Sequence, residues 1–150
     1  METLESIIAA HPFAQGLSPA QVKSLCEYAM LSEFAAGDTI FRQGDPANRF
    51  YLILGGSVAL EARGAEGAPT LLQEIGVGDV LGWSWLFPPY YWNFVARAIT
   101  PVKAVFFYGT LLRENCEVDH HLGYELMKRM AQIVIDRLQT ARKKLIRQNA

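Results

Sequence analysis

The sequence predicts a mostly β protein with flanking helices, in which antiparallel strands form a barrel, sandwich or jelly roll. Three observations support this: turn signals at short intervals through the middle of the chain, β-branched and aromatic runs between them, and helical spacing of apolar residues at both ends. The chain has 150 residues, 51% hydrophobic and 19% charged, a composition typical of one globular domain. We expect a single domain over 1–150, with helices at 1–29, a β barrel at 30–108 and helices at 110–148.

The N-terminal segment is expected to contain two helices. Apolar residues recur at helical spacing between Leu4 and Ile8. A second helix is predicted to begin after Ser18, whose hydroxyl can cap it, with Pro19 at the first helical position and Gln21 completing a capping box.

The β unit is predicted from turns spaced about 8–12 residues apart. The turn signals are Gly37-Asp38, Gly44-Asp45, Gly55-Gly56, Gly64 to Gly67, Gly76 to Gly78, Pro88-Pro89 and Thr100-Pro101. The expected strands between them are TIFRQ (39–43), FYLIL (50–54), SVALEA (57–62), TLLQEI (70–75), NFVARAI (93–99) and VKAVFFY (102–108). Alternation within these runs predicts that Tyr51, Ile53 and Val58 point into the barrel.

After Gly109 the pattern returns to helix. Thr110 is expected to cap a short helix through Cys116, and Asp119 a long helix that runs to about residue 147. Leu122, Leu126 and Ile133 form a stripe suited to packing on the β unit.

A second apolar stripe on the long helix has the three- and four-residue spacing of a coiled-coil seam. Its members are Met127, Met130, Val134, Leu138, Ala141 and Leu145. Because a contiguous exposed apolar face usually marks an interface, we predict a parallel homodimer through this helix. The alternative is a monomer whose helix folds back on its own β unit.

Three runs of sequence resemble the sensor domain of the CRP/FNR superfamily, the cyclic nucleotide-binding domain. They are IFRQGDPANRFYLILGGSVAL (40–60), GVGDVLGWSWLF (76–87), similar to the start of the family's phosphate-binding cassette, and ARAIT (96–100), similar to its exit. The resemblance covers the chain from about residue 13. It implies the family's jelly roll, a double-stranded β-helix, with the ligand inside and a short helix after the cassette glycine aimed at the cyclic phosphate.

The resemblance also implies two charged ligand contacts, which this chain lacks. In the family, a Glu directly after the cassette glycine binds the ribose hydroxyl, and an Arg near the end of the cassette pairs with the phosphate. When Gly82 to Ala98 is laid on this pattern without a gap, Trp83 occupies the Glu position and Trp92 the Arg position; a slip of one residue puts Tyr91 there instead. Since charge-assisted hydrogen bonds contribute about 1.5–3 kcal/mol each, their loss predicts nucleotide affinity weaker by about two to four orders of magnitude.

The aromatic cassette has two interpretations. Its rings can line a pocket for a base, a haem or another planar or apolar molecule, or they can fill the barrel and leave no pocket. The candidate pocket residues are Gly82, Trp83, Ser84, Trp85, Tyr91, Trp92, Asn93 and Arg97. Ser84 and the amides of residues 82–85 would offer a weak anion-binding site. Arg97 has an alternative role as a surface or strand-packing residue.

No residue constellation supports an enzyme or a metal site. His11 lies near a helix end, and His120 and His121 are neighbours that point about 100° apart on a helix. His120 or His121 as a haem ligand is the less favoured interpretation. Cys26 and Cys116 lack metal-ligand spacing and are expected to be reduced thiols.

The charge pattern argues against a polycation that binds nucleic acid, because 14 basic and 15 acidic residues give a net charge of -1. Basic residues nevertheless concentrate in the long helix, where a solvated helix end is favoured over nucleic-acid contact. They are Lys128, Arg129, Arg137, Arg142, Lys143, Lys144 and Arg147. We find no DNA-binding domain before Ala150, no membrane span and no signal peptide, and expect a cytoplasmic protein.

These inferences predict a non-enzymatic, ligand-sensing regulatory module, of the kind used in signal transduction and transcription regulation. It would form a homodimer, bind an unidentified small ligand and act on a protein partner, with cyclic nucleotide binding weak or altered and no resident cofactor. The alternatives are a structural or adaptor dimer with a filled barrel, and the truncated sensor half of a CRP/FNR-type transcription regulator.

Overall fold

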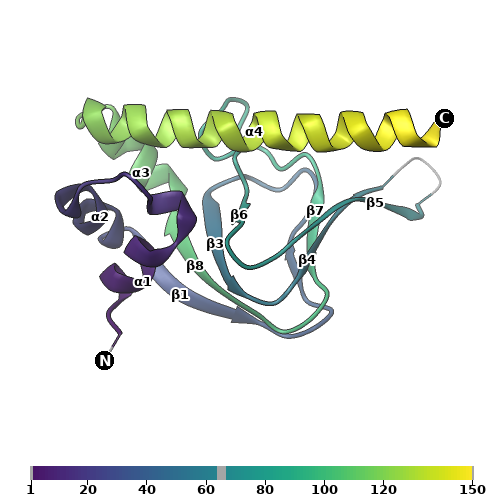
Figure 1. The fold of residues 1–150 in the computed structure, drawn as a ribbon, viewed down its shortest axis with the longest axis horizontal. Helices are drawn as coiled ribbons and strands as arrows, with labels where there is room; N and C mark the ends of the chain where they lie inside the picture. The colour runs from purple at the N-terminus through teal and green to yellow at the C-terminus, as the bar shows by residue number, and fades with distance from the viewer. Residues whose placement is uncertain (1, 64–66, 150) are drawn as a thin grey trace.

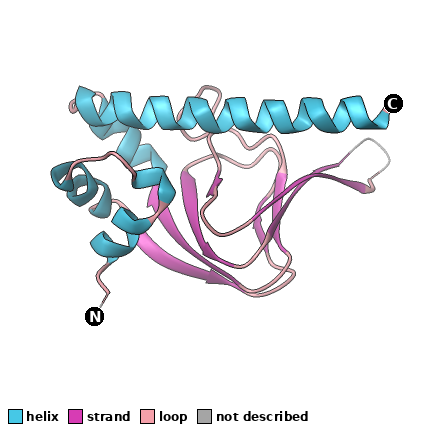
Figure 2. Ribbon diagram, in the orientation of Figure 1, coloured by secondary structure: helices cyan, strands magenta, loops and turns pink. Residues whose placement is uncertain are grey.

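The chain folds as two facing antiparallel sheets, with small helices at one end and a long helix lying across the whole body (Figure 1). This computed structural model describes residues 2–63 and 67–149. The predicted turn at Gly64 to Gly67 therefore falls largely on residues 64–66, outside the described part. Figure 2 shows the helices gathered at the N-terminal end and along one side of the strands.

The N-terminal helices begin where their capping residues predict. They are α1 (Leu4–Ala10), a 3-10 turn η1 (Pro12–Ala14) and α2 (Pro19–Cys26). The backbone N–H of Gln21 donates to the Ser18 hydroxyl at 3.1 Å, and the Ser18 N–H donates back to the Gln21 side chain at 2.9 Å, which confirms the predicted capping box.

In the described residues, eight strands form two four-stranded sheets, which confirms the predicted antiparallel jelly roll. One sheet has the order β1 (Ala29–Phe34), β8 (Val102–Tyr108), β3 (Arg49–Gly55), β6 (Val80–Leu81). The other has the order β2 (Thr39–Phe41), β7 (Val95–Ala98), β4 (Val58–Arg63), β5 (Pro69–Ile75). The six expected runs all contain strands, whereas β1 and β6 were not expected as separate strands.

Strand alternation divides the interior into two cores. On β3, Tyr51 and Ile53 point into the barrel between the sheets, as predicted, while Phe50 and Leu52 pack under the helices. β8 alternates in the same way, with Phe106 inside the barrel and Phe107 on the helix side. We call these the barrel core and the helix-side core; β3 and β8 are shared between them.

The two C-terminal helices are α3 (Gly109–Cys116) and α4 (His120–Gln148). The predicted cap at Asp119 is confirmed, since its carboxylate accepts a hydrogen bond from the Leu122 N–H at 3.1 Å. The predicted cap at Thr110 is wrong: α3 begins at Gly109, two residues earlier than a Thr110 cap implies, and its N-cap residue Tyr108 makes no side-chain cap hydrogen bond. The reason is local packing, because the Gly109 N–H donates to the Asn48 carbonyl at 2.8 Å and a Cβ at Gly109 would lie only 3.0 Å from the Trp85 Cβ, so close contacts fix the backbone at Gly109.

Helix α4 carries the two predicted stripes, with one correction. Leu122 and Leu126 are fully buried in the helix-side core, as expected, but so is Met130, which was predicted in the dimer seam. With Ala131 in place of Met130, the seam has regular four- and three-residue steps. Its members are Met127, Ala131, Val134, Leu138, Ala141 and Leu145.

Candidate ligand-binding site

The cassette between β6 and β7 starts at a glycine in a left-handed conformation. Gly82 has φ +96°, which a residue with a side chain rarely adopts. Residues 84–86 then form a hydrogen-bonded turn, in which the Leu86 N–H donates to the Trp83 carbonyl at 3.3 Å. The short helix that the family resemblance implied after this glycine is absent, so no helix N-terminus is directed at an anion here.

Trp92 covers Gly82 from the barrel side. A Cβ at Gly82 would lie 2.6 Å from the Trp92 ring, and that ring stacks on Phe41 with centroids 3.8 Å apart and planes 8° apart. The side chain is 4% exposed. Its backbone is held by the turn at Gly44-Asp45, because the Trp92 N–H donates to the Asp45 carbonyl at 3.0 Å. An indole therefore fills the space beside the cassette glycine.

The other two tryptophans have different surroundings. Trp85 is fully buried in the helix-side core, where it stacks on Phe50 with centroids 4.8 Å apart; it lies outside the candidate pocket. Trp83 is half-buried, with its ring centroid 6.4 Å from that of Phe87. The Ser84 hydroxyl is buried and has no hydrogen-bond partner within the described part of the chain.

The remaining predicted pocket residues are Tyr91, Asn93 and Arg97, which are exposed or paired elsewhere. Tyr91 is 51% exposed, and Asn93 is also at the surface. Arg97 forms an ion pair with Glu61 on β4, its Nε and Nη2 donating to the carboxylate at 3.0 and 3.2 Å. That carboxylate raises the pKa of Arg97, so this guanidinium is already paired.

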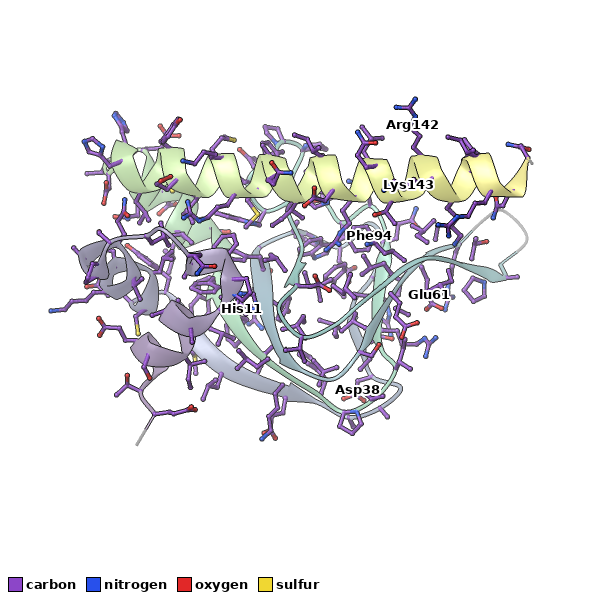
Figure 3. The ribbon with its side chains drawn as sticks, viewed as in Figure 1. His11, Asp38, Glu61, Phe94, Arg142 and Lys143 are labelled. Atoms are coloured by element: carbon purple, nitrogen blue, oxygen red, sulfur yellow. The ribbon has the colours of Figure 1, made fainter. Side chains whose placement is uncertain are left out.

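A groove of about 360 Å³ lies between the barrel and the C-terminal half of α4. Its walls are mostly apolar, and Figure 3 shows Phe94 beneath this half of the helix. The barrel side contributes Leu60, Thr70, Leu71, Leu72, Gln73, Trp83 and Phe94, and the helix contributes Arg137, Ala141, Lys144, Leu145 and Gln148. Of the predicted pocket residues, only Trp83 lines this groove.

Two basic residues tie α4 to the strands at the groove. Arg137 donates to the Val80 carbonyl at 2.6 Å, and Lys144 donates to the Leu71 carbonyl at 2.6 Å. Burial lowers the pKa of Arg137, while the carboxylates of Asp79 and Asp136 act in the opposite direction. The predicted solvated basic face is therefore only partly solvated.

Sequence reasoning missed most of the groove. Arg137, Ala141 and Lys144 follow a spacing of four and three residues and so share one helix face, a signal that could have indicated it. The histidines lie elsewhere: His11 is buried, with its pKa lowered by desolvation, and its Nδ1 accepts a hydrogen bond from the Phe13 N–H at 3.1 Å. His120 and His121 are exposed on the first turn of α4.

The chain is similar to a known protein family and to a curated transcription regulator. Residues 31–118 match the family model of the cyclic nucleotide-binding domain. The CRP-like cAMP-activated global transcriptional regulator of Mycobacterium tuberculosis is 31% identical over 102 residues, which are 68% of this chain and 46% of that protein. The chain thus spans about half the length of the curated relatives it matches.

Solved structures share the fold over most of the chain. A protein of Geobacter metallireducens described as a cyclic nucleotide-binding protein has a TM-score of 0.80 at 28% identity, covering 91% of this chain and 99% of its own. The c-di-GMP responsive global regulator of Xanthomonas campestris has a TM-score of 0.74 at 17% identity, covering 87% of this chain and 64% of its own, which shows the fold alone. No helix in the described residues has the length and apolar character needed to cross a membrane.

Proposed function

This chain belongs to the cyclic nucleotide-binding domain family, and from that premise we propose that it is a non-enzymatic ligand-sensing domain that does not hold a cyclic nucleotide by the family's usual charged contacts. The observation that carries the proposal is the placement of Trp92, whose ring packs on Gly82 and stacks on Phe41. A cyclic phosphate beside Gly82 would have to displace a buried indole and would find no cation in its place.

The remaining polar groups compensate little for this loss. Trp83 at the Glu position has no acceptor for a ribose hydroxyl, and the nearby Arg97 is paired with Glu61. Loss of two charge-assisted contacts weakens affinity by about two to four orders of magnitude. The groove under α4 is a candidate space for a ligand, and its lining is mostly apolar.

Signal output would pass through α4. We propose that the seam residues of α4 pair with those of a second copy in a parallel dimer, because they form an apolar stripe with coiled-coil spacing that is exposed except at the half-buried Ala131 and Val134. A ligand that binds one arrangement of the two helices more tightly than another would shift the population toward it.

Calorimetric titration with cyclic AMP, cyclic GMP and cyclic di-GMP tests the proposal. We expect no saturable binding below about 100 μM and no rise in the thermal midpoint at those concentrations. Trp92→Arg should strengthen cyclic AMP binding by at least about tenfold, since it removes the indole beside Gly82 and supplies the missing cation. Its fold is checked by circular dichroism.

Tyr91→Arg is the matched control, because it adds the same charge at the neighbouring, exposed position. It should leave cyclic AMP binding unchanged. Micromolar binding of any of the three nucleotides by the unaltered protein would contradict the proposal.

A second candidate function is an adaptor dimer without a ligand. It is favoured by the same burial of Trp92, which fills the barrel core beside the cassette.

A further inference from the structure

The groove under α4 combines an apolar interior with cations that lack a counter-ion. Arg137 and Lys144 both line it, and both donate to neutral backbone carbonyls. Within the described residues, neither has a carboxylate oxygen within 4.0 Å. Asp79 and Asp136 act on Arg137 only from farther away.

Arg137 also has unused hydrogen-bonding capacity. Its Nε is buried and has no partner among the residues that the structure describes. A guanidinium presents five N–H donors in a planar fork that matches a carboxylate, so a half-buried, partly unsatisfied Arg next to an apolar space favours an anion. Charge is costly to desolvate unless it is paired. Arg137 is half-buried whereas Lys144 is exposed to water, so Arg137 is the cation that gains more from a ligand's anion.

The groove fits a small ligand in size and in the distribution of polarity. Its volume of about 360 Å³ is near the lower end of the 300–1,000 Å³ usual for small-molecule pockets. Arg137 and Lys144 are seven residues apart, about 10 Å along the helix, and the apolar side chains of Trp83, Phe94 and Leu145 line the same groove. A monoanion can pair with the half-buried Arg137, whereas a dianionic phosphate would bring a second charge into this apolar space, where the other cation, Lys144, is exposed and already gains its solvation from water.

We propose that this groove binds a small monocarboxylate with an apolar body, its carboxylate paired with Arg137 of α4 and its body lying along Trp83 and Phe94. The inference rests on the ligand-sensing function proposed above and assigns the chemical class of the ligand. The anion is then held by the long helix rather than by the cassette. A carboxylate competes with the Val80 carbonyl for Arg137, so binding changes one of the two contacts that tie this half of α4 to the strands.

Octanoate and indole-3-acetate serve as probes, and octanamide and indole-3-acetamide are their uncharged counterparts of the same shape. Binding of octanoate and octanamide is followed by tryptophan fluorescence, since Trp83 lines the groove. Binding of all four compounds is followed by calorimetry on the full chain, because the indole probes fluoresce themselves. We expect at least one acid to bind below about 1 mM and its amide about 10- to 100-fold more weakly, the factor expected for one charge-assisted contact.

Two variants and a control locate the site. Arg137→Gln should weaken acid binding about 10- to 100-fold while leaving amide binding unchanged. Leu71→Trp should block both by filling the groove from β5, and it does not depend on Arg137→Gln being well folded. Arg142→Gln removes a charge from the same helix at a position that Figure 3 shows pointing away from the strands, and should change neither.

Each other outcome overturns the inference. Equal binding of acid and amide removes the role of charge, although ligand sensing would stand. Acid binding that neither Arg137→Gln nor Leu71→Trp affects places the site elsewhere. No binding of either acid at about 1 mM would mean that the groove holds no such ligand. Binding that is lost once the protein dimerises would mean that a second copy covers the groove. The nucleotide titration above decides the proposed function separately.

Discussion

The two halves of α4 belong to one continuous helix but are attached to the protein in different ways. In the first half, Leu122, Leu126 and Met130 are 0% exposed and pack in the helix-side core. In the second half, Leu138 is 64% exposed, and the hydrogen bonds to the strands come from Arg137 and Lys144. The first half is fixed by apolar packing, with added hydrogen bonds from Arg129 to the Phe13 and Gln15 carbonyls. The second half has no fully buried apolar residue, so we expect it to change position at lower cost.

The stability of the isolated chain gives the largest expected contrast between the halves. Leu126→Ala should lower the free energy of unfolding by about 2–5 kcal/mol, because it leaves a cavity in the helix-side core. Leu138→Ala, which removes the same atoms from an exposed site, should lower it by less than about 0.5 kcal/mol. Urea denaturation at a protein concentration below that of dimer formation measures both. Similar losses for the two variants would show that the halves are equally fixed.

Self-association should depend on the second half of α4, in contrast to stability, which depends on the first half. Leu138→Lys places a charge in the proposed seam, so we expect a dimer to become a monomer in sedimentation velocity experiments, while the unfolding free energy of the monomer changes by less than about 0.5 kcal/mol. Gln139→Lys introduces the same charge on the adjacent face of the helix and should leave the dimer intact. A dimer that survives Leu138→Lys would place the interface elsewhere.

Thiol chemistry tests the packing of the first half with the smallest perturbation. Cys116 packs against this half, since a Cβ at Gly123 would lie 3.1 Å from its Cβ. Burial, with smaller contributions from Asp119 and Glu117, raises the pKa of Cys116 to about 11. Because the thiolate is the reactive form, alkylation by iodoacetamide should rise about tenfold per pH unit from pH 8 to pH 10 without a plateau.

A Cys26→Ser background makes this measurement specific to Cys116. A plateau below about pH 9 would mean that the thiol is in contact with water and that the first half of α4 opens readily.

Local signals in the sequence predicted the architecture well. Ser18 and Asp119 form the expected caps because an N-cap is decided by a few neighbouring atoms. Tyr51 and Ile53 point into the barrel because strand alternation leaves no other face for them. The glycine-rich runs near Gly44 and Gly78 likewise correspond to turns with positive φ.

Features that depend on distant packing could not be predicted in this way. Met127 and Met130 are both apolar and three residues apart, so spacing alone put them in one stripe, although Met130 is buried in the helix-side core. Trp85 was grouped with Trp83 and Trp92 because all three lie in the cassette, but the turn after Gly82 directs it into the other core. Arg137 and Lys144 belonged to a basic run, and only the tertiary fold brings them to the strand carbonyls.

Ala141 and Leu145 line the groove and also stand in the seam. The same two side chains would therefore face a small molecule and a second protein chain, which couples the two binding equilibria. Thermodynamic reciprocity then requires that the factor by which saturating ligand changes the dimerisation constant equals the factor by which dimerisation changes ligand affinity. In a cell, the sensitivity of such a detector would be set partly by how much of the protein is made.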